Sequence, residues 1–330
     1  MHSEGVTVWN IAINGYGNLG RGVEKALALA PDMECAGVFT RRAPDSVQTF
    51  GAPVYDLAAL PDMAENIDVV INCGGSATDL THQTPHVAQL CSVVDSFDTH
   101  ARIPEHFAHV DETAKKAGTV AIISSGWDPG LFSMIRVLTH ATLPQGRSTT
   151  FWGRGVSQGH SDAIRRIDGV IDARQYTVPV EETVHAVKAG ADIELTARNM
   201  HTRECFVVAE KDADLARIEQ EIVSMPNYFA DYDTTVHFIS AHELAAHHEQ
   251  IPHGGQVIRT GATSTGVNHR ISFELELDSN PEFTGSVLVA TARACAKKSA
   301  SGVCGAFTLF DITLAELSPL SAEELRAHQL

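Results

Sequence analysis

The sequence predicts an α/β fold, in which a doubly wound parallel sheet is followed by a smaller α+β domain with an open mixed sheet. Two observations favour this class. Up to about residue 130, short continuously apolar segments alternate with amphipathic ones, and such apolar runs are typical of parallel strands buried on both faces. Later segments alternate apolar and polar residues instead, as strands with one exposed face do.

The N-terminal segment has the pattern of a dinucleotide-binding unit. A strand, an amphipathic helix and a second strand are expected at residues 6–14, 21–30 and 35–39. The turn before the helix contains Gly15, Gly17 and Gly20, spaced as G-x-G-x-x-G. The first glycine permits a tight turn, the second lets a pyrophosphate approach the backbone, and the third lets the helix pack closely. The pyrophosphate would lie at the helix N-terminus, where free N–H groups favour negative charge.

The end of the second strand indicates which dinucleotide binds. A site for NAD usually has Asp or Glu here to bind the ribose 2′-hydroxyl. This chain has Thr40, Arg41 and Arg42 instead. Guanidinium groups form paired, charge-assisted hydrogen bonds with phosphate oxygens, so these residues predict a 2′-phosphate and therefore NADP. The alternative is a plain glycine turn followed by two solvated arginines.

The rest of the first part completes a Rossmann-type sheet. Further strands are expected at residues 68–73, 92–95 and 120–124, and helices at residues 82–91 and 103–117. Ligands of such sheets bind beyond the carboxyl ends of the strands. Asp98 and Asp128 follow two of these strands, and as carboxylates they would attract an ammonium group and accept a proton from it. Their alternative role is to cap a helix or a turn.

The second part begins with an expected helix at residues 131–141. Its strands are expected at residues 149–152, 174–178, 204–209, 234–239, 256–260 and 268–277. A helix over residues 283–299 is expected to pack back on the first part, with residues 307–317 beside it. The predicted domains are therefore residues 1–130, joined by about 283–330, and residues 131–282. The second domain also offers several polar residues, many of them in glycine-rich loops. They include Gln158, Asp162, Thr177, Arg203, His253 and Asn268. Taken alone, each such residue is more often structural than functional.

Composition excludes several classes of function. The chain has 330 residues and a formal net charge of −17, which argues against a nucleic-acid or anionic-membrane surface. No apolar run is long enough to span a membrane, and the N-terminus lacks the features of a signal peptide. The six cysteines include no C-x-x-C pair, which is typical of reduced thiols in the cytoplasm.

Two other motifs suggest a zinc site and a thiol nucleophile, but the sequence disfavours both interpretations. His242 and His247 flank an H-E-x-x-x-H sequence, but the zinc motif needs its histidines four residues apart on one helix face, so no metal site is expected. Cys73 follows a strand near the expected cofactor, and a thiol nucleophile there would indicate a semialdehyde dehydrogenase. Its position in the first half of the nucleotide-binding part favours a residue that lines the cofactor.

Several motifs of the chain point together to one family of enzymes. Trp-Asp-Pro-Gly at residues 127–130 and Ser-Gln-Gly-His-Ser-Asp at residues 157–162 are the most specific. The others are Gly-Tyr-Gly-Asn-Leu-Gly-Arg at 15–21, Arg41-Arg42, Gly-Ser-Ala-Thr-Asp at 75–79, Phe-Trp-Gly at 151–153, Arg203, Pro-His-Gly-Gly at 252–255 and Asn268-His269. With these motifs, the sequence resembles the meso-diaminopimelate dehydrogenases over residues 6 to about 315.

This resemblance implies an NADP-dependent, reversible oxidative deamination in lysine and diaminopimelate biosynthesis. The D-centre of meso-2,6-diaminopimelate would give L-2-amino-6-oxopimelate and ammonia, in a homodimer whose residues 131–282 bind substrate and dimerise. Asp98 and Asp128 would hold the reacting amine, and either could take its proton. The other implied substrate residues are Trp127, Trp152, Gln158, Gly159, Asp162, Thr177, Arg203, His253 and Asn268. The implied cofactor residues are Gly15, Tyr16, Gly17, Asn18, Leu19, Thr40, Arg41, Arg42, Cys73, Gly74, Gly75, Ser76, Ser96, Phe97, Asp98, Ser125, Gly126, Trp127, Asp128 and Pro129.

Two competing hypotheses remain at this point. One is another NADP enzyme of the same superfamily, such as a homoserine dehydrogenase or a dihydrodipicolinate reductase. The other is a binding protein that senses NADP without turnover. Oxidation of meso-diaminopimelate with reduction of NADP would distinguish the implied activity from both.

Overall fold

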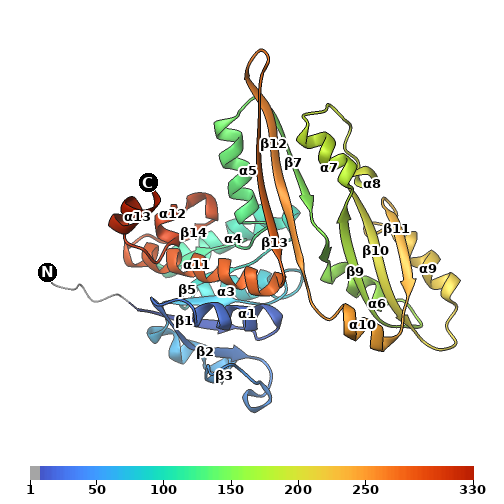
Figure 1. Cartoon of the computed structure of the whole chain (residues 1–330). Coiled ribbons are helices and arrows are strands. Elements are labelled where there is room, and N and C mark those ends of the chain that lie inside the picture. Colours follow the sequence, from blue (N-terminus) through green and yellow to red (C-terminus); the bar gives the residue numbers. More distant parts are fainter. Residues whose placement is uncertain (1–7) are drawn as a thin grey trace. The chain divides into compact units, whose positions relative to one another are not determined.

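The structure is a computed structural model that describes residues 8–330 and divides them into two compact units (Figure 1). Unit 1 comprises residues 8–134 and 281–330, and unit 2 comprises residues 135–280. Of the strand predicted over 6–14, residues 6 and 7 lie outside the described residues.

Unit 1 contains a seven-stranded sheet in the order β14-β6-β5-β4-β1-β2-β3, and every neighbouring pair is parallel. The strands are β1 (Trp9–Asn14), β2 (Met33–Thr40), β3 (Val54–Asp56), β4 (Val69–Asn72), β5 (Ser92–Asp95), β6 (Val120–Ile122) and β14 (Gly305–Phe307). The helices are α1 (Asn18–Leu27), α2 (Leu60–Met63), α3 (Leu80–Ala88), α4 (Ile103–Ala117), α12 (Leu314–Leu317) and α13 (Ala322–Gln329), while α5 (Leu131–Thr142) and α11 (Asn280–Ala300) cross the unit boundary.

Both faces of this sheet are buried. Successive residues of a strand point to opposite faces, and in β1 the residues on each face pack in a different apolar cluster. Ile11 and Ile13 of β1 pack in one apolar cluster with residues of α1 and α11, such as Val23 and Leu288. Ala12, between them, belongs to a second cluster with residues of α3 and α4. The helices therefore cover the sheet on two sides, as the continuous apolar strands predict, and the doubly wound fold class is confirmed.

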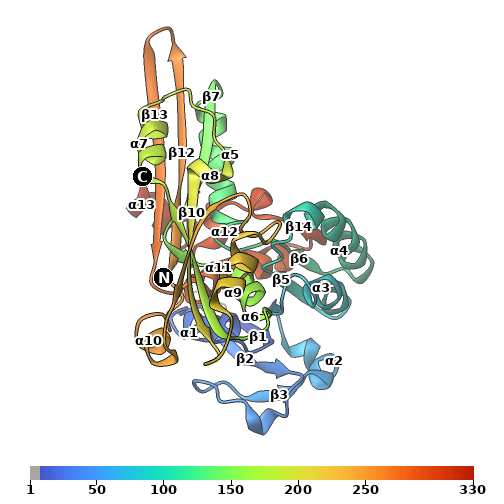
Figure 2. The ribbon, with the colours of Figure 1, turned by 90° about the vertical axis from the view of Figure 1, so that its right-hand side faces the viewer.

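Unit 2 contains two separate sheets (Figure 2). The open mixed sheet has the order β11-β10-β9-β8, and the other strands form an antiparallel sheet in the order β13-β12-β7. The strands are β7 (Gly146–Trp152), β8 (Gly155–Val156), β9 (Val170–Pro179), β10 (His201–Ala209), β11 (Asp233–Phe238), β12 (His253–Ser264) and β13 (Val267–Leu277). The helices are α6 (Gln158–Arg165), α7 (Glu181–Lys188), α8 (Ala197–Met200), α9 (Leu215–Val223) and α10 (Ala241–His247).

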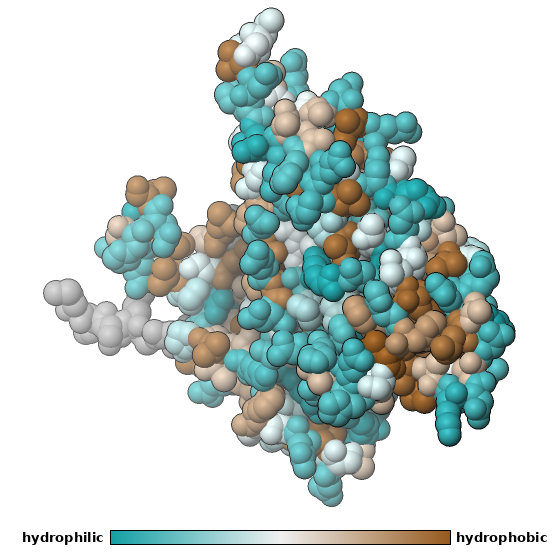
Figure 3. All heavy atoms as spheres, turned by 45° about the vertical axis from the view of Figure 1, so that its right-hand side comes forward, coloured by the Kyte–Doolittle hydropathy of each residue, from teal (hydrophilic) through white to brown (hydrophobic). Residues whose placement is uncertain are grey.

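The core of unit 2 lies against one face of the mixed sheet. Ile164 of α6 and Ile218 and Ile222 of α9 pack on Cys205 and Val207 of β10, and all five side chains are fully buried. The sheet is therefore covered by helices on this face. On the side of the whole molecule shown in Figure 3, hydrophilic side chains predominate and hydrophobic ones gather in small patches. Within residues 8–330, no helix has both the length and the apolar character that crossing a membrane requires.

Candidate active site

The glycine-rich turn of unit 1 leads from β1 directly into α1. Gly15 has a φ of +96°, which side-chain-bearing residues rarely adopt. A Cβ atom on Gly20 would lie 2.2 Å from the carbonyl oxygen of Gly15, so only glycine fits where the helix meets the turn. A Cβ atom on Gly17 would meet nothing within 4 Å, which leaves open space beside its backbone. The turn therefore fits a pyrophosphate group at the N-terminus of α1.

Tyr16 takes part in this turn through its backbone. The residue is 3% exposed, and its hydroxyl donates a hydrogen bond to the carboxylate of Glu24. Burial, together with this bond, raises the pKa of the Tyr16 hydroxyl far above its usual value. The carbonyl oxygen of Tyr16 accepts a hydrogen bond of 2.6 Å from Nη2 of Arg42. The side chain of Tyr16 is thus structural, and its carbonyl ties the turn to the end of β2.

Thr40, the last residue of β2, and the two arginines after it differ in the exposure and contacts of their side chains. Thr40 is buried, and its hydroxyl oxygen accepts a hydrogen bond of 3.1 Å from the backbone N–H of Arg42. Arg41 has a side chain that is 69% exposed, and its Nη2 lies 3.0 Å from Oδ1 of Asp79. Two guanidinium groups thus lie beside the dinucleotide turn, one held by a backbone carbonyl and one by a carboxylate. This donor set suits a 2′-phosphate.

Loops beyond the carboxyl ends of β4, β5 and β6 hold the remaining predicted cofactor residues. Ser76, in the loop after β4, accepts hydrogen bonds at its hydroxyl oxygen from the backbone N–H groups of Asp98 and Thr99, at 2.8 and 3.2 Å. The carboxylate of Asp98 is exposed. The residues in these three loops are Cys73, Gly74, Gly75 and Ser76, then Ser96, Phe97 and Asp98, then Ser125, Gly126, Trp127, Asp128 and Pro129.

Phe97 and Cys73 lie in these loops in largely apolar surroundings. Phe97 is fully buried and stacks on the ring of His106, with ring centroids 4.1 Å apart, so its predicted contact to the cofactor, which stays a prediction, would be made by its backbone. Burial also raises the pKa of the Cys73 thiol far above its usual value. A thiol that stays protonated is a poor nucleophile, so this direction of the pKa disfavours a nucleophilic role for Cys73.

A buried carboxylate organises the loops that carry Asp98 and Asp128, and sequence reasoning missed it. Asp95, the last residue of β5, is fully buried. Its Oδ1 accepts hydrogen bonds from the backbone N–H groups of Phe97 and Ser124, at 3.0 and 2.9 Å. Its Oδ2 lies 2.7 Å from both Thr84 Oγ1 and His106 Nε2. Asp95 therefore joins the loop after β5 to the loop after β6, which positions the two candidate catalytic residues.

Asp128 lies between β6 and α5 at this edge of the sheet and is half-buried. Its neighbour Trp127 is 7% exposed and packs edge-on against Phe132, with ring centroids 5.3 Å apart. The backbone of Trp127 also pairs with that of Gly130. Because β5 and β6 are neighbouring parallel strands, Asp98 and Asp128 follow adjacent carboxyl ends, as predicted.

In unit 2, the residues implied for the reacting end of the substrate surround the start of α6. Ser157 caps this helix, and its Oγ lies 2.6 Å from Nδ1 of His160. Gln158 and Gly159, in the first turn, are exposed. Asp162 forms an ion pair with Arg165 on the same helix, which supports the loop. Trp152, at the end of β7, is 40% exposed and could contact a ligand.

Arg203 and Thr177 face each other across β9 and β10 and are both buried. Nη1 of Arg203 donates a hydrogen bond to the Thr177 hydroxyl, and the guanidinium carbon lies 3.9 Å from the ring centroid of Tyr232. Burial lowers the pKa of Arg203. Burial, with Arg203 nearby, also lowers the pKa of His160 and of His201 to about 4, so both imidazoles are neutral at pH 7. Arg203 therefore carries the local positive charge, as a carboxylate site requires.

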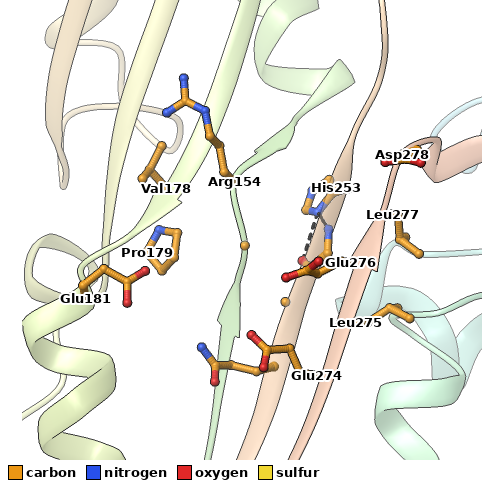
Figure 4. Close-up of a pocket in the computed structure, with 14 residues that line it drawn as sticks. Arg154, Val178, Pro179, Glu181, His253, Glu274, Leu275, Glu276, Leu277 and Asp278 are labelled. Carbon is orange, nitrogen blue, oxygen red and sulfur yellow. Dashed lines mark hydrogen bonds between the residues drawn. The ribbon is translucent and has the colours of Figure 1, made fainter.

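His253 lies in the wall of a pocket of about 470 Å³ in unit 2 (Figure 4). Glu181 of α7 and Glu274 and Glu276 of β13 line the same pocket, whereas the one arginine of its wall, Arg154, pairs with Glu204 at 2.6 Å. Burial lowers the pKa of the His253 imidazole. The excess of carboxylates makes this pocket unsuitable for a carboxylate ligand, so Arg203 remains the better partner for one.

The structure contradicts the placement of Asn268 with His253. Asn268 pairs with Ala262 in the β12–β13 hairpin, nine residues along β12 from His253, which corresponds to about 30 Å. Its side chain is exposed near the hairpin turn. Asn280 is the asparagine close to His253, because its backbone N–H donates a hydrogen bond of 2.9 Å to the carbonyl of Ile251. Sequence reasoning missed Asn280, which no local motif marks.

Comparisons with known proteins give a consistent result. Residues 126–279 match the family model described as the diaminopimelic acid dehydrogenase C-terminal domain. The meso-diaminopimelate D-dehydrogenase of Acetivibrio thermocellus is 54% identical over 330 residues, which cover 98% of each chain. A solved structure of an engineered D-amino acid dehydrogenase bound to NADP⁺ is 44% identical, with a TM-score of 0.87, and covers 98% of this chain and 100% of its own.

A further solved structure bears on Asn280. It is a variant of a Clostridium tetani meso-diaminopimelate dehydrogenase with DAP, 48% identical with a TM-score of 0.93, and covers 97% of this chain and 99% of its own. The variant replaces six residues, a Gln, a Thr, an Arg, a Pro, a His and an Asn. Their types and the intervals between them are those of Gln158, Thr177, Arg203, Pro252, His253 and Asn280 here. The pattern includes Asn280 and excludes Asn268.

Proposed function

We propose residue roles on the premise that this chain belongs to the meso-diaminopimelate D-dehydrogenase family. The chain catalyses the NADP-dependent, reversible oxidative deamination of meso-2,6-diaminopimelate at its D-centre, which gives L-2-amino-6-oxopimelate and ammonia for lysine biosynthesis. The observation that carries the assignment of roles is the pair of carboxylates, Asp98 and Asp128, which follow adjacent strands at the edge of the sheet that also carries the dinucleotide turn.

Asp98 and Asp128 hold the reacting amino group and accept a proton from it. Bound NADP supplies the nicotinamide that takes the hydride of the D-configured carbon. The amine must be neutral to supply its lone pair to the forming imine, so a carboxylate has to remove one proton from the ammonium group first. The exposed carboxylate of Asp98 and the half-buried one of Asp128 can each do this directly or through water. Water then adds to the imine, and ammonia leaves.

The dinucleotide is held by the turn and by the residues after β2. The open space beside Gly17 accommodates the pyrophosphate at the N-terminus of α1. Arg42 supports the turn through the Tyr16 carbonyl, and together with Arg41 it faces the 2′-phosphate. The loop after β4, tied to Asp98 by Ser76, completes the cofactor site.

Unit 2 binds the L-configured end of the substrate. Arg203 binds its carboxylate, because this guanidinium is buried and the two nearby imidazoles are neutral. Thr177 orients Arg203, and His253 and Asn280 complete the distal site in place of the predicted Asn268. Trp127, Trp152, Gln158 and Gly159 contact the reacting end. These residues fix the substrate at three points: the reacting amine, the near carboxylate and the distal centre. Three fixed points determine which hydrogen faces the nicotinamide, and therefore which enantiomer reacts.

The second unit also serves dimerisation in this proposal. β13 is an edge strand of the antiparallel sheet, and along most of its length one side chain in two is exposed. An exposed edge of this length offers a surface that a second copy can cover. A cytoplasmic location agrees with the six cysteines, all among the described residues, which are free thiols.

Asp128→Asn and Asp98→Asn test the catalytic roles. Each variant keeps a side chain of the same shape but loses the proton acceptor, so kcat for meso-diaminopimelate should fall about 10²- to 10⁴-fold in at least one of them. The thermal shift caused by NADP should persist in both. Asp62→Asn, an exposed acid of α2, is the matched control and should leave kcat unchanged. Turnover at the wild-type level in both active-site variants would show that neither carboxylate acts as the base.

A further inference from the structure

Gln175 in β9 is a fully buried side chain without a hydrogen-bond partner. Its exposure is 0%, and neither the amide nitrogen nor the amide oxygen has a partner within the described residues. Buried polar groups in folded proteins are nearly always paired, and an unpaired one opposes folding. A buried amide that lacks both partners therefore suggests a ligand that supplies them.

The strand register places this amide beside the proposed distal site. Gln175 and Thr177 are two residues apart in β9, so their side chains leave the same face of the sheet. Arg203 pairs with Thr177, and Thr234 of β11 pairs with Arg203 on this face. Gln175 is thus a diagonal neighbour of Arg203, a separation that long side chains can bridge. Nε of Arg203 and the hydroxyl of Thr234 also lack partners, so one face of the mixed sheet collects four unpaired polar atoms.

The backbone of Gln175 links this face to the loop at the reacting end of the substrate. Its N–H donates a hydrogen bond of 3.0 Å to Oγ of Ser161, and its carbonyl accepts one of 3.0 Å from the N–H of Ser157. These two serines bracket Gln158 and Gly159 at the start of α6. Gln175 is therefore held in position by its main chain, and its side chain alone is left without partners.

We propose that Gln175 binds the L-configured amino acid centre of the substrate and is a specificity-determining residue of this enzyme. This inference rests on the proposed function and adds a residue to it. An amide offers one donor group and one acceptor, which match the carboxylate and the ammonium of such a centre. Nε2 donates to the carboxylate that Arg203 binds, and Oε1 accepts from the ammonium group. A ligand that lacks either charged group leaves part of the amide unpaired, which selects against it.

The proposal predicts opposite effects on substrate binding and on the free protein. If the amide is satisfied by substrate, an apolar side chain of similar size removes an unpaired polar group and leaves the free protein equally stable or more stable. If a buried water or another structural partner satisfies it, the same replacement lowers stability, whatever the substrate does. Stability and KM together therefore separate a ligand-binding role from a structural one.

Gln175→Met is the test, because methionine is close to glutamine in length and lacks the amide. We expect KM for meso-diaminopimelate to rise about 10- to 100-fold, since hydrogen bonds to charged groups are lost. kcat should stay within about twofold, because the distal centre does not change during the reaction. KM for NADP⁺ and the Tm of the free protein should not worsen, whereas the rise in Tm caused by meso-diaminopimelate should shrink.

Thr149→Val is the matched control, since the Thr149 hydroxyl is also buried and unpartnered in unit 2 but lies on β7. It should leave KM for meso-diaminopimelate unchanged. An unchanged KM in Gln175→Met would overturn the proposal, and so would a rise in KM accompanied by an equal rise for NADP⁺ and a lower Tm. Gln175→Leu serves as a second variant, and failure of both to fold would also overturn it. Failure of the proposed function is recognised separately, as a wild-type enzyme that forms no NADPH from meso-diaminopimelate.

Discussion

Replacing Arg41 and Arg42 with Ala should abolish the preference for NADP over NAD. The two guanidinium groups lie beside the dinucleotide turn, where an acidic residue would be expected in an enzyme that uses NAD. Arg42 also donates to the Tyr16 carbonyl at 2.6 Å, so its loss affects the shape of the turn. Arg41 forms an ion pair with Asp79 in the loop after β4, so its replacement should leave the turn itself intact. The single variants therefore separate phosphate recognition from the integrity of the loop.

The expected magnitude follows from the charge and exposure of these side chains. A hydrogen bond to a charged group contributes about 1.5–3 kcal/mol, and the lower value applies here because the Arg41 side chain is 69% exposed. Two contacts at the lower value give about 3 kcal/mol, which corresponds to about a 150-fold loss in kcat/KM for NADP⁺. kcat/KM for NAD⁺ should stay unchanged in Arg41→Ala and fall modestly in Arg42→Ala.

Initial rates with both cofactors at saturating meso-diaminopimelate provide the assay. Lys116→Ala is the matched control, because it removes an exposed positive charge on α4, elsewhere in unit 1. It should leave the ratio of the two kcat/KM values unchanged. An equal fall for NADP⁺ and NAD⁺ in Arg41→Ala would refute the assignment of this side chain to the 2′-phosphate.

Three other predictions concern stability, assembly and the thiol near the cofactor. Arg293 holds the pKa of Asp32 below its usual value of 3.8, so this buried pair stabilises the fold above about pH 4 and loses its effect as the pH falls through the lowered pKa. Asp32→Asn should cost about 3 kcal/mol in urea unfolding at pH 7 and less at acid pH; equal stability at pH 7 would contradict this. Light scattering should give twice 35.5 kDa, and a monomer mass would exclude the homodimer. Iodoacetamide at pH 8 should leave Cys73 unmodified, because burial keeps its thiol protonated; its labelling in the folded enzyme would show otherwise.

Much of the fold could be predicted because strong local signals agree with the tertiary structure. β5 and α4 have the bounds expected from the sequence, since an apolar run and an amphipathic helix with a following glycine mark them clearly. β3 and β14 were missed because their three residues lie in no run of β-branched residues, whereas the equally short β6 lies in such a run. The sequence also did not predict that the later strands form two separate sheets. Which strands pair across long loops is decided by the tertiary structure, and no local pattern indicates it.

Parts of the candidate site could be predicted where the residues that form them lie close together in the sequence. The glycine turn and the position of Asp98 and Asp128 after adjacent strands follow from patterns of this kind. Asn268 was misplaced because the length of the β12–β13 hairpin fixes its distance from His253, and that length is a tertiary property. Asp95 and Gln175 have no motif at all. Their importance rests on burial and on hydrogen bonds made or missing, which only the folded chain shows.

The most direct test of the account is initial NADPH formation by the wild-type enzyme with meso-diaminopimelate, D-lysine and D-alanine. The D-centre is common to all three, but the distal L-centre occurs only in meso-diaminopimelate. If Asp98 and Asp128 hold the reacting amine and Arg203 binds the distal carboxylate, kcat/KM should be far higher for meso-diaminopimelate than for the other two. Comparable values for D-alanine would contradict a site built around two amino acid centres.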